Sequence, residues 1–327
     1  MKFILVLSSF VMVFLLHPAG AVAKVNFELG LSESLRVDQL DWSIGGRTNP
    51  GNYVNILSEL VWEDLRIWQL ALHAEVTERS ADWPFLTSVL RADIASGLIY
   101  AGSNRDSDYA GNDRTLEFSR SENSADNGET LDASVAAGVL FALGKSNVSL
   151  GPFCGYSRHE QELHMSDGRQ TVSNQFYADL AFGPQVIEVP DTGPFAGLDS
   201  SYATLWRGPW AGVEASWQVS RRWQLRVANE YHSVDYKAVA DWNLRSDFAH
   251  PQSFEHTGDG YGVVTRVEIN VQFWQRLSLS AGVTHGSWKI ENGRDRTFFA
   301  DGSIADTQLN EVNWDSTAFR LGLAGRF

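Results

Sequence analysis

The last twelve residues of the chain, 316–327, have the sequence STAFRLGLAGRF. Large apolar side chains alternate with small or polar ones, so that Phe319, Leu321 and Leu323 share one parity and Arg320 has the other. Successive side chains of a β-strand point to opposite faces. An apolar face opposite a polar one is typical of a membrane β-barrel, whose strands meet lipid on one side and the lumen on the other. This stretch therefore predicts a transmembrane barrel strand.

The chain ends on an aromatic residue, Phe327. A terminal aromatic on such a strand resembles the sorting signal of bacterial outer-membrane proteins. The resemblance implies that the barrel-assembly machinery binds the last strand as a partner. It also implies that the protein is exported to the bacterial outer membrane.

The N-terminus agrees with export. Lys2 precedes an almost purely apolar run at 3–16, and residues 21–23 (AVA) have the small-x-small pattern of a cleavage site. A charged start, a short apolar run and such a site are typical of a secretory signal peptide. We therefore expect a signal peptide at 1–23 and a single outer-membrane barrel domain at 24–327.

The composition excludes several classes of protein. After the predicted signal, no apolar run approaches the ~18 residues of a membrane-spanning helix. The chain nevertheless contains 12 Trp, 9 Tyr and 18 Phe, which aromatic girdles around a polar lumen would explain. The formal charge of −14 argues against nucleic acid as a partner, because phosphate binding needs a basic surface. The single cysteine, Cys154, excludes an internal disulfide.

Alternation elsewhere predicts ten strands. It is clearest at 263–273 (VVTRVEINVQF), and the segment that follows repeats it after a turn of about three residues, 274–276. The long polar connections at 109–129, 166–201, 243–259 and 293–312 are expected to be outer loops. An even strand number places both termini on the periplasmic side. We thus predict an all-β fold, a ten-stranded antiparallel transmembrane β-barrel with short periplasmic turns and strands at 25–44, 53–77, 86–108, 130–144, 147–165, 202–219, 223–242, 260–274, 277–292 and 313–327.

Three short segments resemble those of the omptins, outer-membrane endopeptidases built as ten-stranded barrels. Residues 39–42 (QLDW) are similar to an early-strand segment of that family. Residues 106–108 (DSD) end the third predicted strand, where omptins carry an Asp-x-Asp pair. Residues 241–243 (DWN) end the seventh, where omptins carry Asp-x-His, and the spacing onward to Tyr261 is that of the family. The chain therefore resembles a divergent omptin.

The resemblance implies a water molecule held between an Asp pair and an Asp–His pair. The histidine would take a proton from the water, and its aspartate would orient the imidazole. Asp106, Asp108 and Asp241 stand at three of these catalytic positions. Asn243 stands at the position of the histidine, and a carboxamide does not accept a proton near neutral pH. His250, in the loop that follows, is the candidate that could replace it as the base.

Two functional readings follow from this departure. In the first, the barrel has altered or lost its endopeptidase activity and serves as a receptor, adhesin or structural protein. In the alternative, it is an active omptin-like aspartic-type endopeptidase that uses Asp106, Asp108, Asp241 and a water nucleophile on cationic peptides, which its acidic mouth would attract. A small pore is a third option. No cofactor or metal is expected, and the resemblance implies lipopolysaccharide as a lipid partner.

Overall fold

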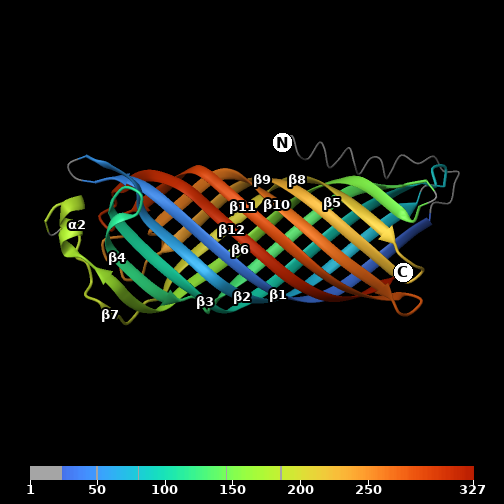
Figure 1. Ribbon diagram of the computed structural model, residues 1–327, viewed down its shortest axis with the longest axis horizontal. Coiled ribbons are helices and arrows are strands. Elements are labelled where there is room, and N and C mark those ends of the chain that lie inside the picture. Colours follow the sequence, from blue (N-terminus) through green and yellow to red (C-terminus); the bar gives the residue numbers. More distant parts are fainter. Residues whose placement is uncertain (1–23, 49–50, 80, 145, 185) are drawn as a thin grey trace.

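The computed structural model describes residues 24–48, 51–79, 81–144, 146–184 and 186–327. These residues form a long, closed antiparallel β-barrel (Figure 1). The predicted fold class, including its ring of ten strands, is confirmed, whereas the predicted signal peptide lies outside the described residues. The ring consists of β1 (Lys24–Arg47), β2 (Tyr53–Arg79), β3 (Leu86–Gly111), β5 (Gly128–Ala142), β6 (Val148–Ser173), β8 (Ser200–Gln218), β9 (Trp223–Asp241), β10 (Phe254–Gln272), β11 (Leu277–Phe298) and β12 (Ile304–Arg326).

The ring closes where the first and last strands meet. Strand β12 pairs antiparallel with β1, and the first pair in this ladder is Glu28 with Arg326. Beyond that pair, Phe27 and Phe327 exchange backbone hydrogen bonds of 3.2 and 2.8 Å. Their ring centroids are 6.2 Å apart. Closure leaves no free edge in the ring of ten described strands, which is the condition for a β-structure to span lipid.

The outer end of the barrel is more regular than the sequence predicts. Strand β4 (Thr115–Ser124) lies within the predicted loop 109–129 and pairs with both β3 and β6 beyond the end of β5. The predicted loop 166–201 contains the end of β6, the helix α2 (Gln175–Phe182) and the short strand β7 (Gly193–Pro194). These segments form strands because pairing gives their backbone N–H and C=O groups hydrogen-bond partners. In the described part of the chain, no helix has both the length and the hydrophobicity to cross a membrane.

Outward-facing side chains divide the barrel into two halves. On β1 the exposed residues of the half near the termini are apolar, as at Leu31, Leu35 and Val37, and Gln39 and Asp41 follow them on the same face. The other strands carry the same apolar belt, for example Leu70 and Leu72 on β2, Ile94, Leu98 and Tyr100 on β3, Trp223, Val227 and Tyr231 on β9, and Phe319, Leu321 and Leu323 on β12. An exposed apolar belt of this kind faces lipid.

The strands are far longer than a membrane requires. Strand β3 has 26 residues, about 85 Å of chain at ~3.3 Å per residue. At a tilt of about 40° it rises about 65 Å, whereas the apolar band of such barrels is ~25 Å tall. More than half of each long strand therefore lies outside the lipid. We call the part beyond the belt the outer half.

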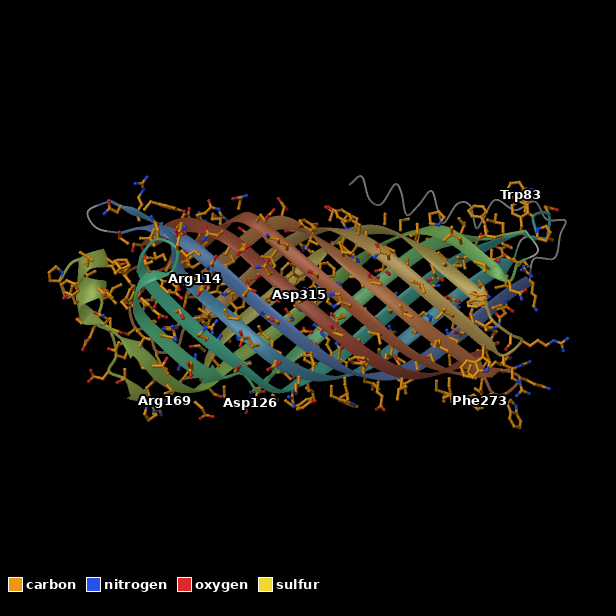
Figure 2. All side chains as sticks on the ribbon, viewed as in Figure 1. Trp83, Arg114, Asp126, Arg169, Phe273 and Asp315 are labelled. Atoms are coloured by element: carbon orange, nitrogen blue, oxygen red, sulfur yellow. The ribbon has the colours of Figure 1, made fainter. Side chains whose placement is uncertain are left out.

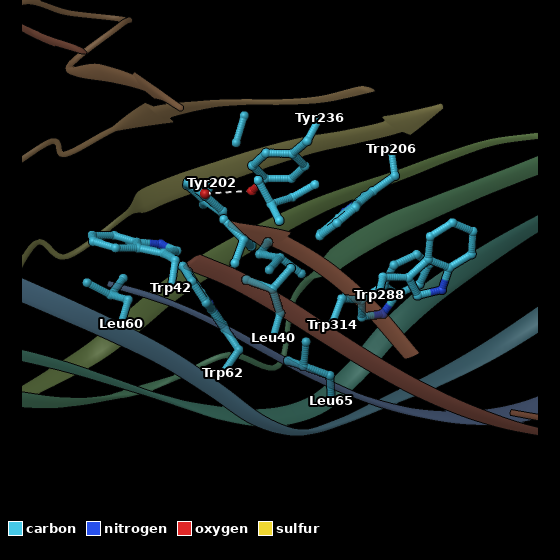
Figure 3. Packing of buried hydrophobic residues seen from close by; sticks show 14 of the residues in the cluster. Leu40, Trp42, Leu60, Trp62, Leu65, Tyr202, Trp206, Tyr236, Trp288 and Trp314 are labelled. Atoms are coloured by element: carbon cyan, nitrogen blue, oxygen red, sulfur yellow. Dashed lines mark hydrogen bonds between the residues drawn. The ribbon is translucent and has the colours of Figure 1, made fainter. Parts of the chain in front are cut away.

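The interior of the outer half is an apolar, aromatic core (Figure 3). Trp62 stacks on Tyr202 with ring centroids 5.1 Å apart, and Trp314 lies 5.6 Å from Trp206. The hydroxyls of Tyr202 and Tyr236 are 2.7 Å apart, so each buried phenol has a partner. This half resembles a small soluble barrel, in which side chains fill the interior.

The interior of the half within the belt is ionic instead. Arg91 donates to Glu75 at 2.7 Å and to Glu214 at 2.6 Å. Arg226 donates to Glu75 at 3.1 Å. Lipid on the outside selects apolar outward residues, so the polar residues of each strand face inward, where they must pair with one another. The barrel thus reverses its polarity along its length, apolar outside in the lipid and apolar inside beyond it.

Candidate functional site

Asp106 and Asp108 lie on β3 beyond Tyr100 and therefore in the outer half. Asp106 is opposite Leu60 of the apolar core, and Asp108 is opposite Ser58. Residues paired across a sheet share a face. Both carboxylates therefore point into the barrel, at the outer end of its core.

The protein surrounds this carboxylate pair and favours its protonation. Burial and the neighbouring charge of Asp108 raise the pKa of Asp106 well above its usual range, against the opposing effects of a hydrogen bond from Trp242 and of the Arg245 guanidinium. Burial likewise raises the pKa of Asp108, against a hydrogen bond from Ser58 and the charge of Arg245. Two close, desolvated carboxylates cannot both ionise easily. The pair can therefore retain a proton that isolated aspartates would lose.

Asp241 is the last residue of β9 and has the other orientation. It shares the parity of the exposed residues Asp235 and Lys237, the outward face of the strand. The Nδ1 atom of His250 lies 2.6 Å from its Oδ1 atom, and both side chains contact solvent. This hydrogen bond raises the pKa of His250. The next residue, Trp242, is the one that packs against the core.

Asn243 connects two outer loops through its amide. Its Oδ1 accepts hydrogen bonds from the Asp199 backbone N–H and the Ser200 hydroxyl, each at 3.0 Å. Its Nδ2 donates to the carbonyl of Gly197 at 2.7 Å. An amide suits this position because it both donates and accepts, which a carboxylate or a neutral imidazole nitrogen cannot do in the same geometry.

The structure thus brings His250 to Asp241 and keeps Asp106 with Asp108, with the two pairs on opposite faces of the barrel wall. Trp242 donates a hydrogen bond to Asp106, and the charge of Arg245 acts on both Asp106 and Asp108. The family motif did not identify either residue. The period of β9 could have identified Trp242, because alternation places residue 242 opposite residues 241 and 243. Among the described residues, no group of three or more histidine, cysteine or acidic side chains could hold a metal ion.

A polar groove of about 470 Å³ lies on the outer surface of β1 to β4, beyond the belt. Arg105, Arg114 and Arg120 contribute cations to it, and Arg114 donates to Glu59 at 2.7 Å. Arg114 is labelled at the outer end of the barrel in Figure 2, whereas Trp83 and Phe273 mark the opposite end. Burial raises the pKa of Tyr109 to about 12, together with its hydrogen bond to Glu59. Four acidic side chains also line the groove: Asp41, Glu59, Glu63 and Glu311. With charges of both signs, it can accommodate a ligand that carries several polar groups.

Comparison with protein families gives one match. The model of the family described as "Pom: Protochlamydia outer membrane protein" matches residues 30–327. No curated protein sequence matches the chain.

Solved structures of outer-membrane proteins are similar to this chain to different degrees. The crystal structure of the outer membrane protease OmpT from Escherichia coli is similar at a TM-score of 0.67 and 12% identity, covering 94% of this chain and 99% of that one. The translocator domain of the autotransporter NalP from Neisseria meningitidis has a TM-score of 0.34 at 9% identity, over 98% of this chain and 94% of that one. A FadL homologue from Pseudomonas aeruginosa has a TM-score of 0.31 at 8% identity, over 92% and 90%. At this identity, the likeness to OmpT is one of fold.

Proposed function

The chain belongs to the Protochlamydia outer membrane protein family, and from that premise we propose that it is a surface barrel without endopeptidase activity. The barrel anchors a rigid, closed outer half, and the outer loops on that half bind partners at the cell surface. On this proposal the omptin-like segments reflect the common barrel architecture rather than a retained catalytic centre.

One observation carries the proposal. An omptin-type reaction needs the acid pair and the acid–base pair to address the same water molecule, and catalytic groups must be within hydrogen-bond reach of the proton they move. Here Asp106 faces the core while Asp241 shares the outward face of β9. Trp242, which packs against the core, donates a hydrogen bond to Asp106.

The test is cleavage of a fluorogenic peptide library, rich in basic residues, by the refolded full-length barrel with added lipopolysaccharide. We expect no cleavage from a protein that shows the heat-modifiable migration of an intact barrel. Asp106→Asn is the matched variant, because asparagine keeps the size and the hydrogen-bond acceptor. Cleavage by the wild type that disappears in Asp106→Asn would refute the proposal and identify a protease.

The second candidate function is the active endopeptidase, and the contact between His250 and Asp241 favours it. A histidine oriented by a carboxylate is the usual general base. On this candidate His250 replaces the missing family histidine and deprotonates a water molecule near the acid pair, after the loop has moved inward. His250→Ala would then abolish cleavage of cationic peptides. If His250→Ala leaves any observed cleavage unchanged, this candidate fails.

Two partners accompany the proposed function. The exposed belt is the surface for outer-membrane lipid, and the groove with Arg105, Arg114 and Arg120 is the proposed contact for the phosphate and sugar groups of lipopolysaccharide, because Arg binds phosphate in a bidentate manner. Phe327, exposed at the end of the last strand, is the proposed contact for the barrel-assembly machinery. Replacing the three arginines by glutamine would weaken retention on lipopolysaccharide vesicles if the groove is the contact.

A further inference from the structure

A cavity of about 70 Å³ lies in the lumen within the belt, on the periplasmic side of the aromatic core. Space of this size holds about five water molecules at ~15 Å³ each, or one small oxyanion. The guanidinium of Arg320 lines the cavity, together with Arg266. A polar cavity beside half-buried arginines is a place where an anion can gain charge-assisted hydrogen bonds.

Small side chains on one wall create this cavity. Ser32, Gly322 and Ser280 face one another in register across β1, β12 and β11. A Cβ atom on Gly322 would lie 2.5 Å from the Ser280 hydroxyl oxygen, so no larger residue fits there without displacing its neighbour. Arg320 and Glu28 line the cavity from this wall, and Arg91, Arg226, Arg266 and Glu268 line it from other strands. The sequence therefore leaves space at the level of Arg320 instead of filling it.

Arg320 has no carboxylate of its own. Within the described ranges, no carboxylate oxygen lies within 4.0 Å of its guanidinium, whose one recorded hydrogen bond is to the Thr284 hydroxyl at 3.4 Å. Arg266 contacts Glu230 through Nη1 at 3.3 Å, while its buried Nε has no hydrogen-bond partner. An inward arginine without a counter-charge is costly in a membrane barrel.

The neighbouring acids are already engaged. Glu75 and Glu214 accept from Arg91, and Glu75 also accepts from Arg226. Asp93 is bound to His73 at 2.7 Å. Glu268 lines the cavity and accepts from Asn270 at 2.8 Å. These bonds leave Arg320, and Nε of Arg266, as the donors available to a ligand.

We propose that this cavity binds a small oxyanion such as inorganic phosphate, with Arg320 as the principal contact and Arg266 as the second. The anion enters from the periplasmic end, because the aromatic core fills the outer half of the barrel. The inference is independent of whether the barrel cleaves peptides, since the cavity lies on the other side of that core from Asp106.

The test is isothermal titration calorimetry of the full refolded barrel with sodium phosphate, against sodium chloride at equal ionic strength. We expect saturable binding of phosphate alone. Arg320→Gln should weaken it about tenfold or more, the usual effect of losing one charge-assisted hydrogen bond. Glu268→Gln should strengthen it, because it removes a like charge beside the anion. Arg221→Gln, in the exposed turn between β8 and β9, should leave the affinity unchanged.

The two lumen variants separate this proposal from a role in which Arg320 only offsets the charge of Glu268 across the cavity. In that case Glu268→Gln would not raise the affinity for phosphate. Arg320→Lys keeps the positive charge and is expected to retain part of the binding, which covers the case in which Arg320→Gln does not fold. Absence of saturable phosphate binding by the wild type, or unchanged binding in a folded Arg320→Gln barrel, would overturn the proposal.

Discussion

The Nδ1 atom of His250 lies 2.6 Å from Oδ1 of Asp241, on the face of the barrel wall opposite to the one that carries Asp106. His250 follows Asp241 by nine residues, and the loop between them folds back so that the imidazole reaches this outward-facing carboxylate. The same hydrogen bond makes the outer loop between β9 and β10 sensitive to the protonation of one exposed side chain.

The first prediction concerns pH and this loop. Because its bond to Asp241 raises the pKa of His250 in the folded state, the pair stabilises the loop fully below the unfolded pKa of about 6.5. That contribution is lost as the pH rises through the folded pKa. Backbone hydrogen exchange at 243–253, corrected for intrinsic rates, should therefore accelerate as the pH rises above about 6.5 and through the raised pKa of His250. His250→Gln should abolish this step, and an identical profile in the variant would contradict the assignment.

The second prediction concerns the inner carboxylate pair. Burial and Asp108 raise the pKa of Asp106 in the folded state, so its ionisation costs stability once the pH exceeds the unfolded pKa of about 3.9. Asp106→Asn should increase the free energy of unfolding at pH 7 by about 1–3 kcal/mol, the range for desolvating a polar group, because Trp242 and Arg245 compensate its charge only in part. The gain should vanish near pH 3 to 4. Urea unfolding at several pH values measures both effects.

Asp82→Asn, at an exposed position in the turn region at the opposite end of the barrel, is the control and should change stability by less than about 0.5 kcal/mol. A lower stability of Asp106→Asn at neutral pH would mean that the charged carboxylate is needed for the fold.

The third prediction concerns Asn243. Replacing it with histidine removes an amide that binds Gly197, Asp199 and Ser200. We expect Asn243→His to lose about 1 kcal/mol of stability, because the loops lose hydrogen bonds of which only the one to Ser200 is part-buried, and to gain no peptidase activity. Asn243→Asp keeps the acceptor and loses only the donor, so its loss should be smaller. New cleavage of cationic peptides by Asn243→His would show that Asn243 alone accounts for the absence of peptidase activity.

The fourth prediction concerns the aromatic core of the outer half. Trp62 is fully buried and stacks on Tyr202. Trp62→Ala should cost about 3–5 kcal/mol, the usual effect of removing a large core side chain. Trp274→Ala, at an exposed periplasmic turn, should cost far less. Because the core fills the lumen, the wild type should not conduct ions in a planar bilayer, and steady conductance would contradict a closed core.

Local pattern was sufficient for the strands. Period-two alternation located the ten strands of the ring. It is interrupted near Asp64, where the structure has a φ of 53° and a shifted register with β3. Alternation did not reveal β4, because a short hairpin within a polar segment lacks a continuous apolar face. The orientation of Asp241 was not predicted either, because the family motif suggested that it faces inward, whereas the parity of β9 places it on the outward face.

The sequence by itself determined that the chain forms an antiparallel membrane barrel, because lipid imposes an alternation that can be seen within a single strand. Only the tertiary structure decided which charges neutralise one another, as with Arg91 and Glu214, 123 residues apart in the chain. It also decided that Arg320 lies beside a cavity. Such partners depend on strand tilt and on the stagger at which the ring closes, and these are properties of the whole barrel rather than of any one strand.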